Sequence, residues 1–294
     1  SSAAVSRYLN GGYVSEEKKE QIKKVIEETG YQPSAQARIL RTKRACLVGV
    51  VVPKINSESI SRVTAGIEQV LSRRGYQMLL ASTDNQPAKE ITYLKLFENY
   101  PVDGIVLIAT VITGEHNKFL KEAKVPVVVV GQYTKYANCI YHDDYGAGKA
   151  MGKIVAEAAK DKGRVAYIGV TREDKAVGTS REEGFRAGLK SQGMELEEEY
   201  VRKSQFTMES GYEAALDLLE KKKDIAVLSC ATDTIAAGAI EAILACSKKK
   251  IPQGVQESGT RMEYALKGSS IKVTGFGDNQ FLKAVTGGIP TVHF

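Results

Sequence analysis

The sequence predicts an α/β protein with two lobes, each a doubly wound parallel sheet, preceded by a short helical segment. From Cys46 onward, apolar runs rich in β-branched residues alternate with stretches of helical periodicity. Such alternation is typical of parallel sheets joined by right-handed helical crossovers. The runs are almost wholly apolar, which indicates strands covered on both faces. The predicted strands are too many for a single sheet of ordinary size, so we predict two lobes.

Each expected element has its own signal in the sequence. The strands are the apolar runs "CLVGVVV" (46–52), "QMLLAS" (77–82), "GIVLIA" (104–109), "PVVVV" (126–130), "RVAYIG" (164–169), "IAVLSC" (225–230) and "IKVTGF" (271–276). The helices are the periodic stretches between them, at 58–74, 87–99, 116–123, 146–161, 179–192, 209–222 and 233–247.

The order of these elements predicts the domain organisation. The expected parts are a helical head and hinge (1–45), a first α/β lobe (46–157), a second lobe (158–288) and a strand returning to the first lobe (289–294). We interpret the stretch near 254–270 as a surface insertion. Because ligands bind at the carboxyl ends of parallel strands and between domains, we expect a ligand cleft between the lobes.

Composition excludes several classes of protein. Of the 294 residues, 43% are hydrophobic and 26% charged, as in ordinary soluble globular proteins. The four cysteines have neither CxxC nor metal-site spacing, so free thiols are expected. The sequence has no apolar run of 18 residues and no export leader, so we predict a cytoplasmic protein without membrane contact.

Catalytic signals are poor. The sequence has no GxGxxG after its first strand, no GxxxxGK[ST] and no GxSxG. The run "HDD" at His142 could suggest a metal ligand, but Asp144 is also an apt cap for the helix that follows. We therefore predict a binding protein rather than an enzyme, with no cofactor and no metal.

The N-terminal segment is basic. Residues 1–45 hold nine Lys and Arg against five Glu, a large part of the net charge of +6. A basic excess on a small segment is the footprint of a polyanionic partner, although Glu–Lys pairs such as Glu20–Lys24 on a solvated helix would also explain it. A short helix carrying Val5 and Leu9, a "GG" break and a second helix ending at Gly30 are expected here.

The chain resembles the LacI family of transcriptional repressors along nearly its whole length. The segments that carry the resemblance are "VSRYLN", "YVSEEKKEQI", "ETGYQPSAQARILRTKR", "LVGVVVP", "VDGIVLI", "DDYGAGKAMG", "SREEGFRAGL", "ATDTIAAGA" and "VTGFGDN". The wording "VPKINSES" and "GFGDN" looks most like sucrose-operon-type repressors of Gram-positive bacteria. The resemblance implies a periplasmic-binding-protein-like core behind a helix-turn-helix head, the first helix of which is missing from this sequence.

The resemblance also implies which residues contact DNA. Residues 1–9 would be the recognition helix in the major groove, and 34–41 the hinge helix, with Leu40 as the wedge in the minor groove. The DNA-binding positions that it implies are Ser1, Ser2, Ala3, Ser6, Arg7, Asn10 and Leu40.

Effector residues follow from the same resemblance. The positions that it implies for a sugar or sugar phosphate in the cleft are Ser57, Glu58, Asp144, Arg181, Phe206, Thr232 and Asp233. Arg181 would fork to sugar hydroxyls and Phe206 would form an aromatic platform. The residues alone favour a structural interpretation of three of these positions, with Arg181 as a surface arginine, Phe206 as a core aromatic and Asp233 as a helix N-cap.

Three functions compete for this sequence. The favoured one is a sugar-responsive repressor, a homodimer on a palindromic operator, in which a sugar or sugar phosphate moves the lobes and lowers DNA affinity. The alternatives are a sugar-binding protein without a DNA-binding role and a sugar-modifying enzyme. The basic head argues against the first alternative, and the missing catalytic motifs argue against the second.

Overall fold

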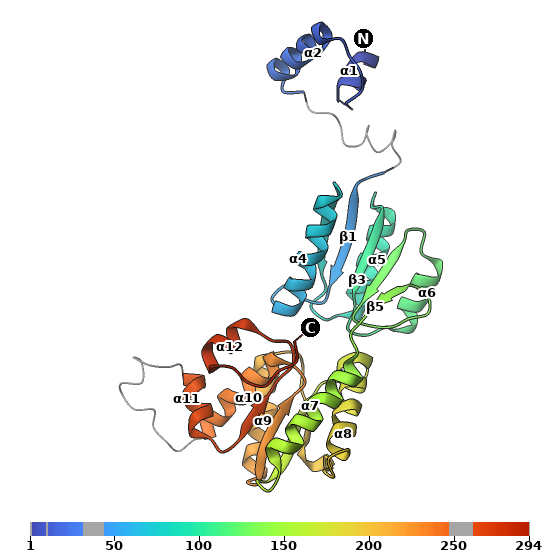
Figure 1. Cartoon of the computed structure of the whole chain (residues 1–294). Helices are drawn as coiled ribbons and strands as arrows, with labels where there is room; N and C mark the ends of the chain where they lie inside the picture. The colour runs from blue at the N-terminus through green and yellow to red at the C-terminus, as the bar shows by residue number, and fades with distance from the viewer. Residues whose placement is uncertain (1, 10, 32–43, 247–260, 294) are drawn as a thin grey trace.

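The computed structural model describes residues 2–9, 11–31, 44–246 and 261–293. Two short helices stand at the N-terminal end, and two α/β lobes follow one another along the chain (Figure 1). Each lobe is a parallel sheet with helices on both faces, so the predicted fold class is confirmed. The expected hinge helix at 34–41 lies outside the described residues.

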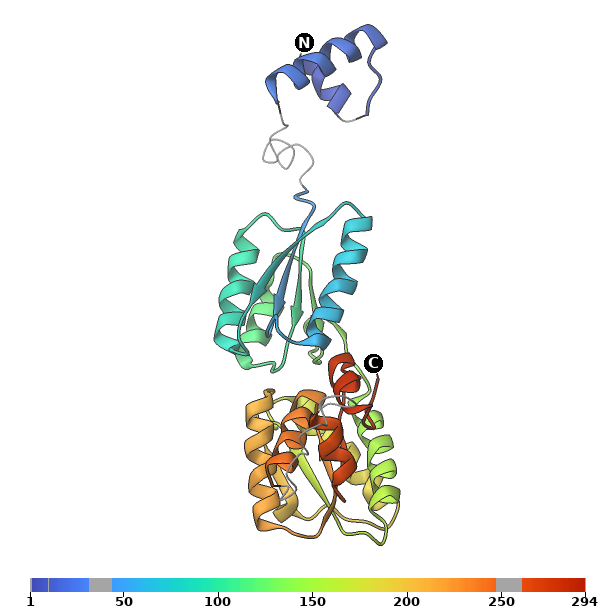
Figure 2. The same ribbon diagram turned by 90° about the vertical axis from the view of Figure 1, so that its left-hand side faces the viewer.

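In the described residues, the first lobe has a five-stranded parallel sheet in the order β2-β1-β3-β4-β5. Its strands are β1 (Leu47–Val52), β2 (Gln77–Ser82), β3 (Gly104–Ile108), β4 (Val127–Val130) and β5 (Asn138–Ile140). Its helices are α4 (Glu58–Arg73), α5 (Pro87–Asn99) and α6 (Gly114–Glu122). Helix α4 covers one face, and α5 and α6 cover the other (Figure 2). Successive side chains of β1 point to opposite faces of the sheet. Val50 and Val52 therefore pack with α4, while Val51 packs with α5 and α6.

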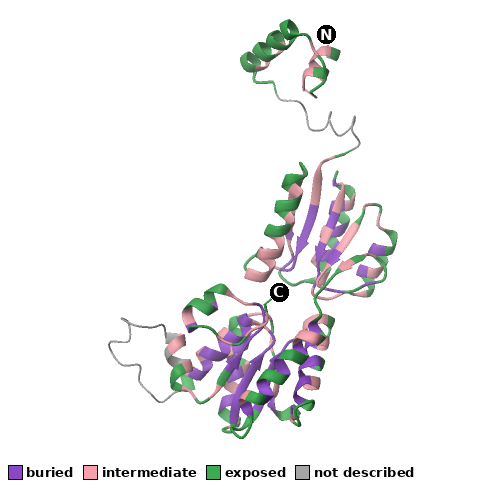
Figure 3. Ribbon diagram, viewed as in Figure 1, coloured by how far each residue is buried: buried purple, intermediate pink, exposed green. Residues whose placement is uncertain are grey.

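The second lobe has a four-stranded parallel sheet in the described part of the chain, in the order β7-β6-β8-β9. Its strands are β6 (Arg164–Gly169), β7 (Val201–Lys203), β8 (Ile225–Cys230) and β9 (Lys272–Thr274). Its helical elements are α7 (Asp144–Ala159), the π-helix η1 (Lys175–Arg181), α8 (Glu182–Lys190), the 3-10 turn η2 (Glu198–Tyr200), α9 (Met208–Lys221), α10 (Asp233–Cys246), α11 (Arg261–Gly268) and α12 (Gln280–Thr286). Buried residues fill the sheet and the inner helix faces (Figure 3).

The expected lobe boundary at 157/158 needs correction. We predicted that the first lobe extends to 157, through most of the helix expected at 146–161. Helix α7 instead packs against α8, and its Met151 and Val155 are buried in the core of the second lobe. The chain therefore passes between the lobes at 141–143, directly before α7.

The C-terminal segment also differs from the expectation. We predicted that 289–294 forms a strand returning to the first lobe. Within the described residues 289–293 there is no strand, and the segment runs alongside the end of β9 in the second lobe. The Gly275 amide donates to the Pro290 carbonyl and the Gly277 amide to the Val292 carbonyl, each at 2.9 Å.

The head consists of α1 (Ser2–Leu9) and α2 (Glu16–Thr29). Helix α2 ends at Gly30 in the left-handed conformation (φ 61°), as predicted for a C-terminal glycine. Val5 and Leu9 are half-buried, but Val25 is 54% exposed, so the described residues of the head bury little apolar surface among themselves.

Helices α7 and α8 touch backbone to backbone. A Cβ on Gly152 would overlap the Phe185 carbonyl oxygen, and one on Gly188 would overlap the Lys149 carbonyl oxygen. Only glycine permits this approach, and it brings Asp144 and Arg181, at the starts of these helical segments, to the same place.

We expect Gly152→Ala to lower the free energy of unfolding by about 1–3 kcal/mol, because backbone atoms must move apart. Gly66→Ala is the matched control, since Gly66 lies in α4 with open space at its Cβ. That change should raise stability by about 0.5–1 kcal/mol through helix propensity. Urea denaturation of both variants checks this. Equal effects of the two alanines would contradict the close packing.

Candidate functional site

A cavity of about 200 Å³ lies between the two lobes. It is lined by the loops at the carboxyl ends of the strands and by the first turns of the helices that follow. All seven residues predicted for effector binding are among its lining residues. A larger hollow of about 520 Å³ at Lys203 and Gln205 is shallow and belongs to the second lobe alone. The interlobe cavity is therefore the better candidate for a ligand site.

Arg181 and Asp144, which both line the cavity, form a buried ion pair. The Arg181 guanidinium donates from Nε (3.0 Å) and Nη2 (2.5 Å) to Asp144 Oδ1, and from Nη1 to the Ala231 carbonyl at 2.5 Å. Its carbon Cζ lies 3.4 Å from the centroid of the Phe276 ring. Each residue is 6% exposed, so Arg181 is not a surface arginine.

This geometry changes the expected part of Arg181 in ligand binding. We predicted that its guanidinium forks to two sugar hydroxyls. Its Nε, Nη1 and Nη2 atoms all donate to protein oxygens. The pair of parallel donors, Nε and Nη2, is directed at Asp144 instead of a ligand. Asp144 also differs from the expectation that it caps α7, because the N-cap is Asp143, which accepts from the Gly146 amide.

Asp233 stands at the start of α10 and organises the loop after β9. Its Oδ1 accepts from the Thr291 hydroxyl at 2.8 Å, and its Oδ2 from the Asn279 amide at 2.7 Å. The N-cap of α10 is Thr232, whose hydroxyl accepts from the Ile235 amide. Asp233 is thus not the helix cap that the residues alone allowed.

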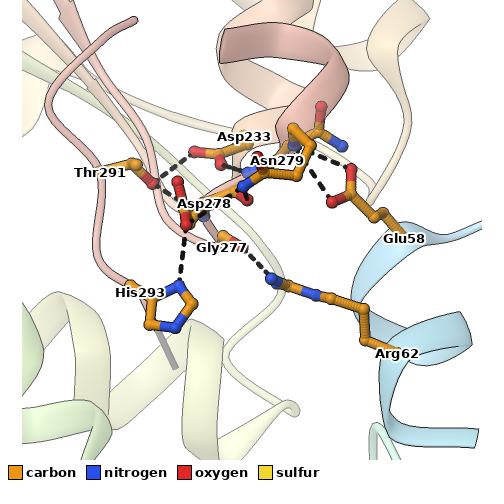
Figure 4. A network of polar contacts seen from close by, with 9 residues as sticks. Glu58, Arg62, Asp233, Gly277, Asp278, Asn279, Thr291 and His293 are labelled. Carbon is orange, nitrogen blue, oxygen red and sulfur yellow. Dashed lines mark hydrogen bonds and ion pairs between the residues drawn. The ribbon is translucent and has the colours of Figure 1, made fainter. Parts of the chain in front are cut away.

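The first lobe holds this same loop from the other side (Figure 4). From α4, the Arg62 guanidinium donates to the Gly277 carbonyl at 2.5 Å. The Glu58 carboxylate accepts from the Gln280 amide, with both oxygens 3.1 Å away. Two side chains of the first lobe are therefore bound to backbone groups of the second.

Two further hydrogen bonds cross between the lobes. The Lys54 ammonium donates to the Phe206 carbonyl at 2.7 Å. Gln132 Nε2 donates at 2.8 Å to Asp174 Oδ1, which also accepts from the Val177 amide at 2.9 Å. Phe206 lines the cavity and also packs against the core of the second lobe, so both interpretations of this aromatic apply.

Burial raises the pKa of two carboxyls in the cavity. The pKa of Asp174 is raised by desolvation, which outweighs the hydrogen bonds from Val177 and Gln132. The pKa of Asp233 is raised for the same reason, against the hydrogen bonds from Asn279, Thr291 and Phe276. In both side chains, hydrogen bonds from neighbouring groups offset only part of the cost of burying the ionised form.

Sequence reasoning missed several lining residues. The structure adds Lys54, Gln132, Asp174, Phe276 and Asn279 to the lining. Each follows the carboxyl end of a strand by a few residues, a position that by itself marks ligand-facing loops in parallel sheets. Arg62 was missed because its partner is a backbone carbonyl far away in the sequence.

The DNA-binding positions lie partly outside the described residues. Ser1, Asn10 and Leu40 belong to the part that is not described. Ser2, Ala3, Ser6 and Arg7 lie on α1, where Ala3 and Arg7 are exposed and Ser6 is half-buried. On α2, Lys19 pairs with Glu16 at 3.3 Å and Lys24 with Glu28 at 3.9 Å, so part of the basic charge there is balanced locally.

Neither a metal site nor a membrane span emerges from the described residues. Among them, no three His, Cys, Asp or Glu side chains gather as metal ligands, at His142 or elsewhere. None of the helices formed by these residues has the length and apolar character needed to cross a bilayer.

Two family profiles match the chain. The profile described as periplasmic binding proteins and sugar binding domain of LacI family covers residues 45–265. The profile described as bacterial regulatory proteins, lacI family, covers residues 1–34. The chain belongs to the LacI family. The predicted DNA-binding repressor with a sugar effector is thereby confirmed at the level of the family.

Individual relatives of this LacI-family chain agree. It is 33% identical over 236 residues to the sucrose operon repressor of Staphylococcus xylosus, covering 80% of this chain and 72% of that protein. It is 29% identical over 244 residues to catabolite control protein A of Priestia megaterium, covering 82% and 73%. In fold it is similar to the lac repressor dimer bound to operator and the anti-inducer ONPF, with a TM-score of 0.79 at 18% identity over 99% of this chain and 83% of that one.

Stability should depend on pH through Asp174. Because its pKa is raised in the folded protein, the folded state binds this proton more tightly than the unfolded chain, in which Asp has a pKa of about 3.9. The contribution of Asp174 to the free energy of unfolding is fully present below about pH 4. It is lost as the pH rises through the pKa that Asp174 has in the folded protein. In Asp174→Asn the amide oxygen can accept both hydrogen bonds, so that loss should disappear.

Urea denaturation from pH 4 to pH 7 tests this expectation. Relative to the wild type, Asp174→Asn should gain stability as pH rises, whereas Asp161→Asn, which changes an exposed aspartate after α7, should not. A pH-independent difference between Asp174→Asn and the wild type would contradict the assignment.

Proposed function

We propose that this protein represses a carbohydrate-use operon, and that a saccharide bound in the interlobe cavity lowers its affinity for operator DNA. The observation that carries this proposal is that side chains of both lobes converge on one cavity and are bound to each other across it. Lys54, Glu58, Arg62 and Gln132 of the first lobe all bond to the second lobe. A ligand that touches both lobes must change the free energy of their arrangement.

Strand β1 gives that arrangement a physical route to the head. At the carboxyl end of β1, the chain continues into Lys54, Ser57 and Glu58 at the cavity. At its amino end, the Ala45 and Cys46 amides donate to the two carboxylate oxygens of Asp103 at 3.0 and 2.8 Å. The start of the segment that leads toward the head is therefore fixed to the first lobe.

The binding roles of individual residues belong to the same proposal. Glu58, Asp174 and Asp233 accept hydrogen bonds from sugar hydroxyls, and Phe206 offers an apolar face to the ring. Arg181 positions Asp144 rather than holding the ligand itself. A cavity of about 200 Å³ suits a small polar ligand such as a single sugar ring.

Binding to an operator also implies an oligomeric state, a set of DNA contacts and a cellular location. The protein acts as a homodimer on a palindromic site, with Arg7 on α1 and the hinge segment including Leu40 as its DNA contacts. Its place of action is the cytoplasm, where the operator is. We assign it no catalysis, since the family consists of regulatory proteins. A sugar-binding protein without a DNA-binding role is disfavoured by the head.

Arg7→Ala in the full-length repressor should weaken binding to its operator by about 1–3 kcal/mol, the value of a good bidentate base contact. Lys24→Ala removes the same charge from α2 and is the control. Fluorescence anisotropy at fixed salt compares operator with scrambled DNA. Equal losses for both variants on both DNAs would mean that Arg7 contributes only general electrostatics.

Arg62→Ala should weaken saccharide binding about three- to tenfold, because the lobes lose one of the bonds that hold them around the cavity. Lys118→Ala, on the exposed side of α6, removes the same charge from the first lobe without touching the cavity. Calorimetric titration with the saccharide that releases the operator is the measurement. Unchanged affinity in Arg62→Ala would show that lobe closure does not contribute to ligand binding.

A further inference from the structure

We infer that the effector of this protein is a neutral, unphosphorylated saccharide and that the cavity discriminates against sugar phosphates. This inference rests on the proposed function, and it narrows the ligand from "sugar or sugar phosphate" to one of the two. It is carried by the charges of the residues around the cavity and by what each charged group already binds.

Anionic ligands usually bind at helix N-termini, where free amides and the helix dipole favour negative charge. In this cavity, four helical segments begin with a carboxylate of the chain's own. Glu58 is the first residue of α4, Asp144 the first of α7, Asp174 the N-cap of η1 and Asp233 the first of α10. All four line the cavity, so the positions that would favour a phosphate already carry negative charge.

The cationic groups that a phosphate would need are already bound to protein oxygens. Among the described residues that line the cavity, the lysine and the arginine are Lys54 and Arg181. Arg181 is neutralised by Asp144, and Lys54 donates to the Phe206 carbonyl. Arg62, just outside the lining, donates to the Gly277 carbonyl. His142 also lines the cavity, at an exposed position.

The three remaining carboxylates accept hydrogen bonds from neutral donors, and no Lys, Arg or His side chain of the described residues forms an ion pair with them. Glu58 accepts from the Gln280 amide, Asp174 from Gln132 and Val177, and Asp233 from Asn279 and Thr291. Carboxylates with lone pairs toward a cavity bind hydroxyl donors well and repel a phosphate. Burial already raises the pKa of Asp174 and of Asp233, and the negative charge of a phosphate beside them would raise both pKa values further.

Calorimetry on the full-length protein tests the inference with matched pairs of ligands. The pairs are fructose and fructose 6-phosphate, glucose and glucose 6-phosphate, and ribose and ribose 5-phosphate, with sucrose as a further neutral sugar. The neutral sugar that binds should do so at least about a hundredfold more tightly than its ester. An ester that binds as tightly as its sugar, or more tightly, overturns the inference and leaves the proposed function standing.

Two variants show whether the carboxylates cause the discrimination. The double variant Glu58→Gln/Asp174→Asn retains acceptor oxygens for Gln280, Gln132 and Val177 and removes two charges from the cavity. It should narrow the ratio of sugar to ester affinity about tenfold. The control Glu68→Gln/Asp161→Asn removes two exposed charges elsewhere and should leave the ratio unchanged. An equal ratio in both double variants contradicts the electrostatic origin.

The same titrations, together with fluorescence anisotropy of labelled operator DNA, separate this inference from the proposed function. If none of these sugars or esters binds, and none changes the binding of the protein to its operator, the proposed function fails and the inference falls with it. If a neutral sugar binds and releases the operator while its ester does neither, both stand.

Discussion

The buried ion pair between Asp144 and Arg181 is the interaction on which the ligand-facing side of this protein depends. Asp144 begins α7 directly after the chain has crossed from the first lobe, and Arg181 lies at the junction of η1 and α8. The guanidinium also binds the carbonyl at the end of β8 and stacks on Phe276 after β9. One cation therefore ties the lobe crossing to two strand ends. Because a buried charge that loses its partner is strongly destabilising, neither residue can be replaced alone without loss.

Around that fixed pair, the cavity is built from contacts that are easier to break. The bonds from Arg62, Glu58 and Lys54 to the second lobe all end on backbone groups and are partly exposed to solvent. Such bonds contribute modestly, about 0.5–1.5 kcal/mol each, or somewhat more when one partner is charged. A firmly held ion pair together with weaker bonds between the lobes allows a small ligand to shift the balance between lobe arrangements.

The sequence predicted those features of the structure that depend on residues close together in the chain. The buried strands were predictable because strands such as "IAVLSC" are apolar on both faces. Strands β5 and β7 were missed because each has three residues at a sheet edge, and α12 because it is a seven-residue helix. All seven effector positions line the cavity, yet the bonding of Arg181 was not predictable, since Asp144 lies 37 residues earlier. The lobe boundary was misplaced because a helix does not reveal in its sequence which sheet it covers.

The central claim is that the saccharide and the operator influence each other's binding through the lobes. The most direct test is calorimetry of the neutral saccharide with full-length protein, free and saturated with operator DNA selected by the protein from a random pool. Linkage requires that operator lower saccharide affinity by the same factor by which saccharide lowers operator affinity. The account predicts equal factors, about 5- to 150-fold for a coupling of typical size. A saccharide affinity that is the same with and without operator would contradict it.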